Sequence, residues 1–497
     1  MADFDLAIIG GGINGAGIAR DAAGRGLKVL LVEQNDLASG TSSASTKLIH
    51  GGLRYLALGA FRLVREALAE REVLLRIAPH LVQPMRFVLP AQAVDRPVWQ
   101  LRLALLAYDW MAGRRTLGRH KALDFNVAPA GKPLKRRFTH GFEYSDCTVD
   151  DSRLVVLNAV DAAARGASIR TRTRCIRADR GPEWTLVLNA RGRRDVATAR
   201  VLVNAAGPWL ASVADTVLGV DLRPPVRLVK GSHIVVKSLF DHGRAYLLPT
   251  ADGRYAFARP FGAEFTLIGT TDEDFVGDPA ASKVEPREID YLCNVVNRYF
   301  RDSIAPTDVI WAFAGVRALY DDGSLRAQDA TREYVLVLDQ DVEKAPLLTV
   351  YGGKITTYRR LAEAALAKLS HVFAAAPPWT ADAPLPGGDF GRLDRLVAQT
   401  RQRWPFLAES HARRLVAAYG TRVKAVLGEA TRADDLGPRF GGDLTAAEIR
   451  YLMRHEWADT AADVLWRRSK LGLQVSKDER EAIEHVMAAA VGAQSSR

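Results

Sequence analysis

The first 35 residues alternate between apolar runs and glycine-rich turns in a way that predicts a strand–helix–strand unit. Phe4–Ile9 and Leu27–Val32 are short apolar runs typical of buried strands, and Ile13–Ala23 between them has helical character. Gly24 and Gly26 provide the signals that end such a helix. The chain is therefore expected to open with a βαβ unit.

Further along, the same kind of pattern predicts a second layer. Between Val226 and Leu319, runs such as SHIVVK, RYAFARP and FTLIGTT alternate apolar and polar residues and indicate a mostly antiparallel sheet that would lie over the first fold. The other expected elements are helices at Phe61–Ile77 (closed by Pro79), Ser152–Ala164 and Thr357–Leu369, and strands at Arg200–Val203 and Leu347–Tyr351.

A run rich in proline and glycine at Ala374–Gly388 predicts a boundary between two parts of the chain. Beyond it the pattern is helical, and Thr445 and Glu448 have the spacing of a capping box that opens a helix running to about Glu456. This last part contains no recognisable cofactor or substrate motif, so we expect a helical cap or interaction domain.

Length and cysteine content narrow the class of protein. A chain of 497 residues has room for about three domains. Its three cysteines, Cys147, Cys175 and Cys293, form no CxxC pair, and their odd number argues against a disulfide framework. No basic region precedes the first apolar run, and no apolar run approaches the roughly 18 residues that span a bilayer. We expect a protein that faces the cytoplasm without a signal peptide or transmembrane helix.

The formal net charge of +11 favours an anionic partner such as a phosphate, an acidic lipid or a nucleic acid. Much of the excess lies between Arg96 and Arg137, where ten Lys and Arg stand against two Asp, a net charge of +8. The apolar and aromatic residues between Trp99 and Met111 fit an amphipathic helix on an anionic membrane surface, and equally a buried helix with a solvated basic end. No DNA- or RNA-binding motif accompanies the charge, so nucleic acid is disfavoured.

Gly10, Gly12 and Gly15 form a GxGxxG motif between the first strand and helix, and Glu33 ends the second strand. In a dinucleotide-binding unit the first glycine allows a tight turn, the second lets backbone approach a pyrophosphate, and the third lets helix and strand pack closely. The pyrophosphate rests on N–H groups at the start of the helix, and the acidic residue accepts hydrogen bonds from a ribose. The charge of Glu33 disfavours a 2′-phosphate, but the unit alone does not separate NAD from FAD.

The segment TSSASTKLIHGGLRYL, residues Thr41–Leu56, is the second motif. Its hydroxyl groups can hydrogen-bond a diphosphate or the edge of a flavin, and its paired glycines allow backbone to lie against a ring. Its composition alone also fits an ordinary solvated loop.

This segment and five others, FEYSDCTVDDSRLV, LVNAAGPW, LVKGSHIVV, IGTTDEDFVGDP and YGGKITTYRRLAE, resemble the FAD-dependent (aerobic, respiratory) glycerol-3-phosphate dehydrogenase family in sequence and order, and the resemblance extends through WADTAADVLWRRSKLG. It implies an α/β protein with a glutathione-reductase-like FAD-binding Rossmann fold, an antiparallel-sheet substrate domain and a C-terminal helical domain. It also implies oxidation of sn-glycerol 3-phosphate to dihydroxyacetone phosphate by hydride transfer to FAD. Electrons would pass to ubiquinone or menaquinone at the cytoplasmic face of the inner membrane, and family members are often homodimers.

The resemblance assigns FAD contacts to several separate stretches of the chain. These are Gly10, Gly12, Asn14 and Gly15 in the first turn; Glu33 and Gln34; Thr41, Ser45, Lys47, Leu48, His50 and Gly52 in the second motif; and Ala205, Gly207, Gly353, Lys354 and Thr356. The helix after Gly353 would direct its positive end at the edge of the flavin where negative charge collects on reduction.

The implied reaction needs cations that hold a phosphate, hydrogen-bonding partners for the hydroxyls, and a base for the C2 hydroxyl proton. The resemblance supplies Arg54, Arg317 and Lys354 as cations, Tyr55 and Thr270 as hydrogen-bonding partners, and Arg317 and His233 as catalytic residues.

Each of these residues also has an ordinary structural interpretation. His233 fits a packed histidine that only positions the substrate as well as it fits a base. Arg54 and Arg317 would serve equally in ion pairs, for which Asp272 or Asp321 is available. The remaining histidines have no ligand spacing, so no metal site is expected.

Domain boundaries and alternatives complete the prediction. We expect an FAD-binding domain of residues 1–70, 141–225 and 330–373, a substrate-binding and membrane-facing domain of residues 71–140 and 226–329, a linker at 374–388, and a C-terminal helical domain of residues 389–497. A glycerol-3-phosphate oxidase that uses O₂ and an amine or amino-acid oxidase keep the same fold, although the latter needs one arginine for a carboxylate rather than three cations. A flavin-containing scaffold or sensor is the non-enzymatic alternative.

Overall fold

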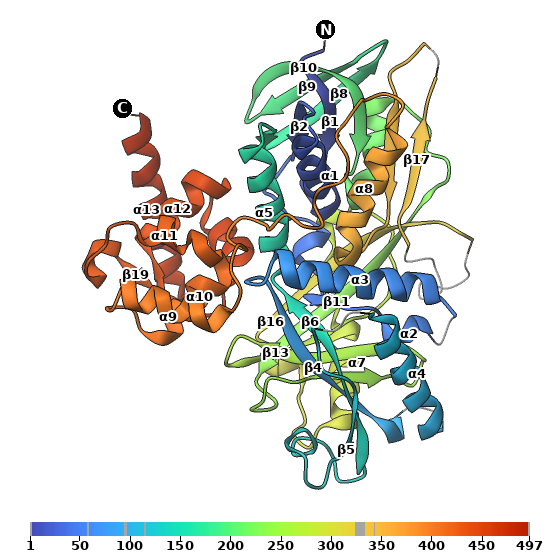
Figure 1. Cartoon of the computed structure of the whole chain (residues 1–497), viewed down its shortest axis with the longest axis vertical. Coiled ribbons are helices and arrows are strands. Elements are labelled where there is room, and N and C mark those ends of the chain that lie inside the picture. Colours follow the sequence, from blue (N-terminus) through green and yellow to red (C-terminus); the bar gives the residue numbers. More distant parts are fainter. Residues whose placement is uncertain are drawn as a thin grey trace.

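The computed structural model describes residues 2–56, 59–93, 97–113, 116–323, 333–341 and 343–495. Two sheets lie one above the other, and the C-terminal helices form a separate unit beside them (Figure 1).

The first sheet is built around the predicted βαβ unit. Its central strand β1 (Phe4–Ile9) lies between β10 (Arg193–Asn204) and β2 (Val29–Val32), and the three strands run parallel. The strands of this sheet follow the order β17-β18-β10-β1-β2-β7. On one side, β7 (Ser168–Arg170) pairs with β2; on the other, β18 (Leu347–Tyr351) pairs with β10, and β17 (Val335–Asp339) runs antiparallel to β18. Strands β8 (Thr173–Arg180) and β9 (Trp184–Ala190) extend from β10 as an antiparallel ribbon.

Both faces of this sheet are buried, which explains the uninterrupted apolar runs in its strands. Leu6 and Ile8 belong to the core under the helices, whereas Ala7 and Ile9 belong to a second core that contains Trp184 of the antiparallel ribbon. Three helices cover the first face: α1 (Ile13–Gly24), α5 (Asp151–Ala164) and α8 (Tyr358–Lys368) (Figure 1).

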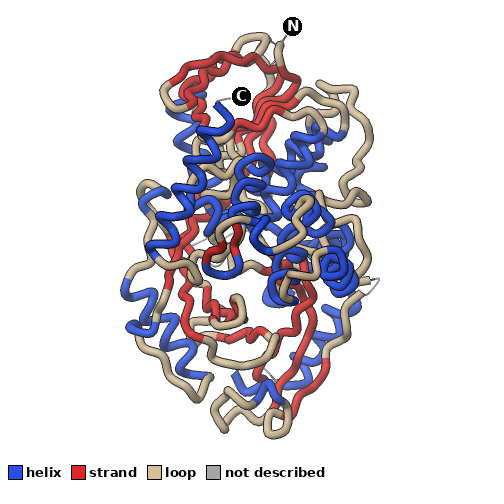
Figure 2. Tube along the Cα trace, turned by 90° about the vertical axis from the view of Figure 1, so that its left-hand side faces the viewer, coloured by secondary structure: helices blue, strands red, loops and turns tan. Residues whose placement is uncertain are grey.

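The second sheet has ten strands, which curve round the lower half of the molecule (Figure 2). The predicted antiparallel pattern between Val226 and Leu319 is confirmed there. Along the sheet the strands are β15 (Glu273–Asp274), β11 (Val226–Lys237), β14 (Phe265–Gly269), β13 (Tyr255–Phe261), β12 (Ala245–Pro249), β4 (Val82–Pro90), β6 (His140–Val149) and β3 (Leu48–Ile49), with β16 (Trp311–Tyr320) on β11 and β5 (Lys121–Asp124) on β6.

Sheet membership differs from the expected boundaries at two strands, because β3, which lies within residues 1–70, and β6 both belong to the larger sheet. Strand β6 begins near the expected start of the second FAD-binding segment at 141, but it pairs with β4 along its length and so belongs to the larger sheet. The pairing joins segments about 60 residues apart, from Val82↔Val149 to Pro90↔Gly141. A local pattern identifies a strand but not its distant partner, so the sequence did not show which sheet β6 joins.

The basic segment is not one helix. Its described residues form helix α4 (Val98–Met111), strand β5 and a 3₁₀ turn at Pro129–Gly131. Leu101, Leu105 and Tyr108 are buried, whereas Trp99 and Trp110 are 61% and 78% exposed. One side of this helix packs into the protein and the other carries exposed tryptophans, and the membrane interpretation stays a prediction. No described helix combines the length and apolar character needed to cross a bilayer.

Two further helices flank the larger sheet, α3 (Phe61–Ile77), which matches its prediction, and α7 (Pro286–Tyr299); the short α2 (Leu53–Leu56) precedes α3.

The C-terminal unit has its own hydrophobic core. The predicted cap of α12 (Ala446–Glu456) is present, because the Thr445 hydroxyl accepts a hydrogen bond from the Glu448 N–H. In a complete capping box the Glu448 carboxylate would accept a hydrogen bond from the Thr445 N–H. Here it accepts hydrogen bonds from Arg414 and from the Tyr419 hydroxyl instead. The other helices of this unit are α9 (Leu393–Arg403), α10 (Glu409–Tyr419), α11 (Val423–Leu427) and α13 (Lys477–Ser495).

Buried ion pairs join the C-terminal unit to the first sheet and its helices. Arg468 contacts Asp36 at 2.8 Å, and Arg153 at the start of α5 forms a bidentate pair with Glu456. These pairs lie at the carboxyl end of β2 and at the N-terminus of α5, next to the loop that contains Thr41–Lys47. The C-terminal unit is thus held against the part of the fold that carries the candidate site.

Candidate functional site

A single elongated cavity of ≈ 420 Å³ runs between the two sheets and collects most of the residues singled out in the sequence. Its volume lies in the range of cofactor and small-molecule sites. One end is formed by Glu33, Gln34 and strand β8, and the other by Arg317 and Lys354. Of the predicted FAD contacts, those that line it are Gly10, Gly12, Asn14, Glu33, Gln34, Thr41, Ser45, Leu48, His50, Gly52, Ala205, Gly207, Gly353, Lys354 and Thr356.

Gly10 and Gly15 have the steric roles that their spacing predicts, and the role of Gly12 beside a pyrophosphate stays a prediction. Gly10 has φ +114°, and a Cβ there would lie 2.5 Å from the Ala205 carbonyl oxygen. A Cβ on Gly15 would lie 1.9 Å from the Gly10 carbonyl oxygen, so this glycine serves helix packing and does not contribute to the wall of the cavity. A Cβ on Gly12 would meet only the Ser42 hydroxyl, at 3.2 Å, and would point at the space that a cofactor needs.

Glu33 stands at the end of β2 with its carboxylate facing the turn. The N–H groups of Gly11 and Asn35 donate to its two oxygens at 2.7 and 2.8 Å. Burial raises the pKa of Glu33, although these two N–H groups oppose the shift. Each carboxylate oxygen retains lone-pair capacity, so the group is placed to accept the hydroxyls of a ribose as well.

At the other end, the glycine pair at 352–353 brings backbone against the first helix. The Asn14 side chain donates to the Gly352 carbonyl oxygen at 2.9 Å, while its own Oδ1 is buried without a hydrogen-bond partner. A buried polar atom without a partner is uncommon, and here it lines the cavity beside a turn that a Cβ would obstruct. A 3₁₀ turn at Ile355–Thr357 and helix α8 begin at this point, so N–H groups face the same space. These features fit a flavin dinucleotide laid from Glu33 to Lys354.

Lys47 is placed differently from the expectation. It does not line this cavity; its ammonium is buried on the far side of the Thr41–Lys47 loop, where it contacts Asp151 at 2.9 Å and the Ser43 carbonyl oxygen at 2.7 Å. Burial, only partly offset by Asp151, lowers the pKa of Lys47 to about 8. Lys47 therefore supports the loop from behind, because Asp151 also accepts a hydrogen bond from Ser45 at 2.7 Å.

The predicted substrate residues converge at the Lys354 end. Tyr55, Thr270, Arg317 and Lys354 all line the cavity, and the Lys354 ammonium lies 3.9 Å from the centre of the Tyr55 ring. Strands β11 and β16 leave room for them, since a Cβ on Gly231 would lie 2.6 Å from the Thr270 hydroxyl and 2.8 Å from an Arg317 nitrogen. This end of the cavity thus combines two cations with two hydroxyl groups.

Arg54 and Arg317 are the two predicted arginines of the substrate site. The side chain of Arg54, a residue of α2, lies outside the described residues. Arg317 is ion-paired with Asp272, the partner that the sequence offered, and both side chains border the cavity. The pair is only partly buried, with 30% of the Arg317 side chain exposed. The ion pair therefore leaves part of the guanidinium free to face a ligand.

His233 is not among the described residues that line the cavity. Its ring is buried and stacks on Phe313 with 4.9 Å between ring centres, and its Nε2 shares a 2.9 Å hydrogen bond with the Thr46 hydroxyl, which does line the cavity. Burial, with the nearby charges of Lys47 and Arg317, lowers the pKa of His233 to about 3. The imidazole therefore reaches the site only through Thr46.

Several lining residues were missed by the sequence reasoning. Tyr255 and Phe257 of β13 face the cavity, and Phe257 meets His50 edge-on at 5.9 Å between ring centres. They stand two residues apart in the RYAFARP run, and residues at that spacing point to the same face of a strand. The alternation in this run could therefore have identified them as a pair. Ser42 was also missed; its hydroxyl accepts a hydrogen bond from the Ile13 N–H at 2.9 Å.

Comparison with known proteins adds two family matches. Residues 5–359 match the model of the FAD-dependent oxidoreductases, and residues 378–494 match the C-terminal domain of alpha-glycerophosphate oxidase.

Individual relatives cover nearly the whole chain. A glycerol-3-phosphate dehydrogenase of Pseudomonas aeruginosa is 50% identical over 96% of this chain and 93% of its own length. A D-erythritol 1-phosphate dehydrogenase of Brucella abortus is 49% identical over 96% of both chains. Among solved structures, a glycerol-3-phosphate dehydrogenase from Bacillus halodurans complexed with FAD is 26% identical, with a TM-score of 0.74 over 98% of this chain and 89% of that one.

Proposed function

Because the chain belongs to the family of FAD-dependent oxidoreductases, we propose that it oxidises sn-glycerol 3-phosphate to dihydroxyacetone phosphate. The observation that carries the proposal is the convergence of Arg317, Lys354, Tyr55 and Thr270 at one end of a cavity whose other end fits a dinucleotide. The similarity to a glycerol-3-phosphate dehydrogenase at 50% identity supports the choice of substrate. An amino acid would need one cation for its carboxylate, and this end offers more.

Bound FAD supplies the acceptor for the hydride that leaves C2 of the substrate. The protein has to hold the phosphate, orient C2 and steady the charge that develops on the C2 oxygen. We assign the phosphate to Lys354 and Arg54, because cations bind phosphate by charge-assisted hydrogen bonds. Arg317, held by Asp272, is assigned to the C2 oxygen, while the hydroxyls of Tyr55 and Thr270 contact the remaining substrate oxygens.

The decisive measurement is anaerobic bleaching of the protein-bound flavin by glycerol 3-phosphate. The second candidate substrate is D-erythritol 1-phosphate, because a relative that acts on it is 49% identical. We expect glycerol 3-phosphate to bleach the flavin with the higher second-order rate constant, followed by D-erythritol 1-phosphate. A higher rate constant for D-erythritol 1-phosphate would transfer the assignment to that substrate. No bleaching by either compound, with peroxide formed from amino acids, would refute the proposal.

We assign His233 a positioning role rather than that of the base. With a pKa of about 3 it is neutral but weakly basic near pH 7, and its Nε2 is engaged by Thr46. His233→Gln keeps a side-chain partner for Thr46, so we expect the bleaching rate to fall less than about 10-fold, against the 100- to 10,000-fold typical of a lost base. His233→Ala, which removes that partner, should cost more. Equal large losses in both variants would identify His233 as the base.

We further propose that the protein lies on the cytoplasmic face of the inner membrane and passes its electrons to a quinone. The exposed Trp99 and Trp110 of α4, within the basic segment Arg96–Arg137, are the kind of side chains that enter the headgroup layer. An oxidase that uses O₂ would not require this surface.

Binding to anionic liposomes at low salt tests the membrane assignment. Charge reversal at Arg114 and Arg115, which lie outside the described residues, should weaken binding, and Trp110→Ser should weaken it further in the same direction. The matched control is Trp404→Phe, since this tryptophan is buried in the C-terminal unit. If all variants bind like the parent protein, the membrane surface lies elsewhere.

A further inference from the structure

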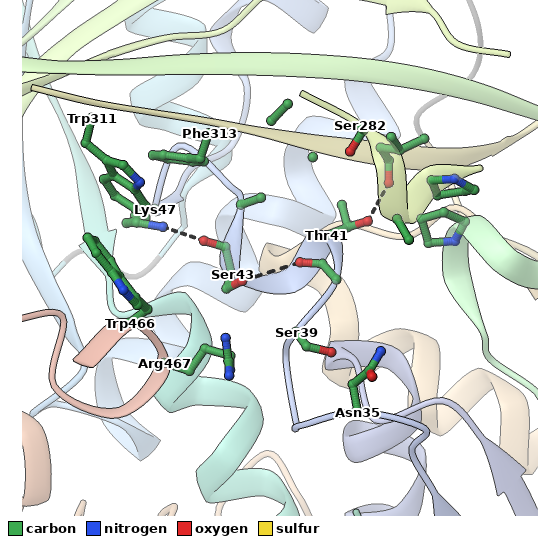
Figure 3. A pocket seen from close by; sticks show the side chains of 18 of the residues that line it. Asn35, Ser39, Thr41, Ser43, Lys47, Ser282, Trp311, Phe313, Trp466 and Arg467 are labelled. Carbon is green, nitrogen blue, oxygen red and sulfur yellow. Dashed lines mark hydrogen bonds between the residues drawn. The ribbon is translucent and has the colours of Figure 1, made fainter. Parts of the chain in front are cut away.

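A loop of residues 36–47, the flavin loop, has a cavity on each side. Three of its residues line both the elongated cavity between the sheets (the flavin cavity) and a second cavity of ≈ 390 Å³, namely Gly40, Thr41 and Ala44. Figure 3 shows this second cavity, with Thr41 and Ser43 on the side of the loop and Trp466 and Arg467 on the side of the C-terminal unit. Close packing is what makes protein interiors rigid. Because the middle of the flavin loop borders a cavity on each side, its conformation depends more on polar contacts than on packing.

Asp36 begins the flavin loop and is held by two arginines of the C-terminal unit. Its buried carboxylate accepts hydrogen bonds from Arg468 at 2.8 and 2.9 Å and from Arg467 at 2.5 Å. Two residues further on, the Ala38 N–H donates to the Gly11 carbonyl oxygen at 3.1 Å. The arginines therefore fix the start of the flavin loop beside the glycine turn on which a pyrophosphate is expected to rest.

The other end of the flavin loop is held by Asp151, the first residue of α5. One carboxylate oxygen of Asp151 accepts hydrogen bonds from the Ser45 hydroxyl at 2.7 Å and from the Lys47 ammonium at 2.9 Å. Its second oxygen lies 3.0 Å from the ammonium of Lys470 in the C-terminal unit, which also contacts Asp150 at 2.8 Å. Although burial acts in the opposite direction, the ammonium groups of Lys47 and Lys470 lower the pKa of Asp151 to about 2. Asp151 is therefore ionised near pH 7 and joins Lys470 to the flavin loop.

The cations that hold both ends of the flavin loop come from one short stretch of the C-terminal unit, the 467–470 segment. This segment belongs to the motif WADTAADVLWRRSKLG, which has no part in the oxidation of substrate described above. Just before it, the Asp463 carboxylate contacts Arg172 at 2.7 Å, and the Arg172 N–H donates to the Asn35 carbonyl oxygen at 2.8 Å. One stretch of the C-terminal unit thus fixes the flavin loop at both ends and braces the residue before it.

We propose that the 467–470 segment is a positioning element for FAD, which holds the flavin loop in the conformation that binds the cofactor. FAD binding and the docking of the C-terminal unit are coupled, because each favours the same conformation of the loop. Such coupling is reciprocal: a change that loosens the docked segment weakens FAD binding, and bound FAD stabilises the docked segment. The proposal goes beyond the proposed function, since it requires the flavin but no particular substrate.

The first test is titration of the full-length FAD-free protein with FAD. Arg467→Met removes a cation at the Asp36 end of the flavin loop, and Lys470→Met removes one at the Asp151 end. We expect the dissociation constant of FAD to rise at least about 10-fold in each variant, because each loses hydrogen bonds between charged groups that hold the loop. Arg467→Lys keeps the charge, so its dissociation constant should lie closer to that of the parent protein than to that of Arg467→Met.

The matched control is Arg414→Met, which breaks an ion pair of the same burial inside the C-terminal unit. Arg414 contacts Glu448 at 2.7 Å with 19% of its side chain exposed, against 17% for Arg467, and its described hydrogen bonds stay within that unit. This variant should lower Tm as Arg467→Met does, yet keep the dissociation constant of FAD within about 2-fold of the parent value. If Arg414→Met weakens FAD binding as much as the other two variants, or if those two bind FAD like the parent, the proposal is wrong.

Hydrogen exchange of the parent protein tests the reverse direction without any variant. With FAD bound, the N–H groups of residues 459–470 should exchange at least about 5-fold more slowly than in the FAD-free protein. Helix α9, none of whose described residues lines either cavity, should exchange alike in both states. Equal exchange of residues 459–470 with and without FAD would overturn the proposal. A failure of the proposed function would leave these results unchanged, because neither measurement contains glycerol 3-phosphate.

Discussion

Replacing Arg317 by alanine should abolish bleaching of the flavin by glycerol 3-phosphate while FAD stays bound. The guanidinium borders the cavity, is partly free of its partner Asp272, and lies beside the Thr270 hydroxyl. Removal of one donor that stabilises a developing oxyanion typically costs 100- to 1,000-fold in rate. We expect the bleaching rate to fall by at least about 100-fold, measured by stopped flow on enzyme with its full flavin content.

The matched control for this experiment is Arg227→Ala. Arg227 lies on the adjacent strand β11 and pairs with Asp274 at 2.6 Å, so it is also an arginine in an ion pair on the same sheet, but it does not line the cavity. The control should retain the parent rate within about 2-fold, because an arginine that does not line the cavity cannot stabilise charge that develops on the substrate. Retained bleaching in Arg317→Ala would refute the role assigned to Arg317.

The second large effect is expected at Gly12. Because a Cβ there would contact only the Ser42 hydroxyl, at 3.2 Å, and its φ of −81° suits any residue, Gly12→Val leaves the protein fold without serious strain. The added methyl groups would occupy the space through which backbone approaches the pyrophosphate. We expect a folded protein that is purified without flavin, with FAD affinity reduced at least about 100-fold, as judged by flavin absorbance and by titration with FAD.

Gly243→Val controls for the effect on stability of replacing a glycine by valine. Gly243 has no neighbour within 4 Å of a Cβ and lies in the turn between β11 and β12, away from the cavity. This variant should retain full flavin and an unchanged Tm. If Gly12→Val retains FAD at the parent affinity, the cofactor does not pass that turn. A variant at Gly10 would not separate loss of FAD binding from loss of folding, because a side chain there would be strained by the positive φ and by the nearby Ala205 carbonyl.

The chemistry of the dinucleotide end of the cavity was readable from local sequence because it depends on few neighbours, whereas the residues of the substrate end were assigned through the resemblance to a family. The glycine spacing at 10–15 and the acidic residue at 33 belong to one βαβ unit, and the structure places them as that unit requires. Tyr255 and Phe257, by contrast, could not be placed in the cavity from local sequence. Their spacing predicts that they share a face of a strand, but which face meets the cavity depends on the register of β13 with its neighbours.

The sequence by itself determined the nucleotide-binding unit, the antiparallel second layer and the helical C-terminal part, because periodicity and glycine spacing are local properties of the chain. Most of the residues along the flavin cavity were assigned through the resemblance to a family, because they belong to motifs far apart in the chain. Only the tertiary structure decided that Lys47 supports the cofactor loop from behind, that His233 reaches the site through Thr46, and that β6 joins the larger sheet. It alone also revealed the second cavity, whose walls come from segments near residues 41, 311 and 466. Contacts between such distant segments arise when helices and sheets pack, and no local pattern records them.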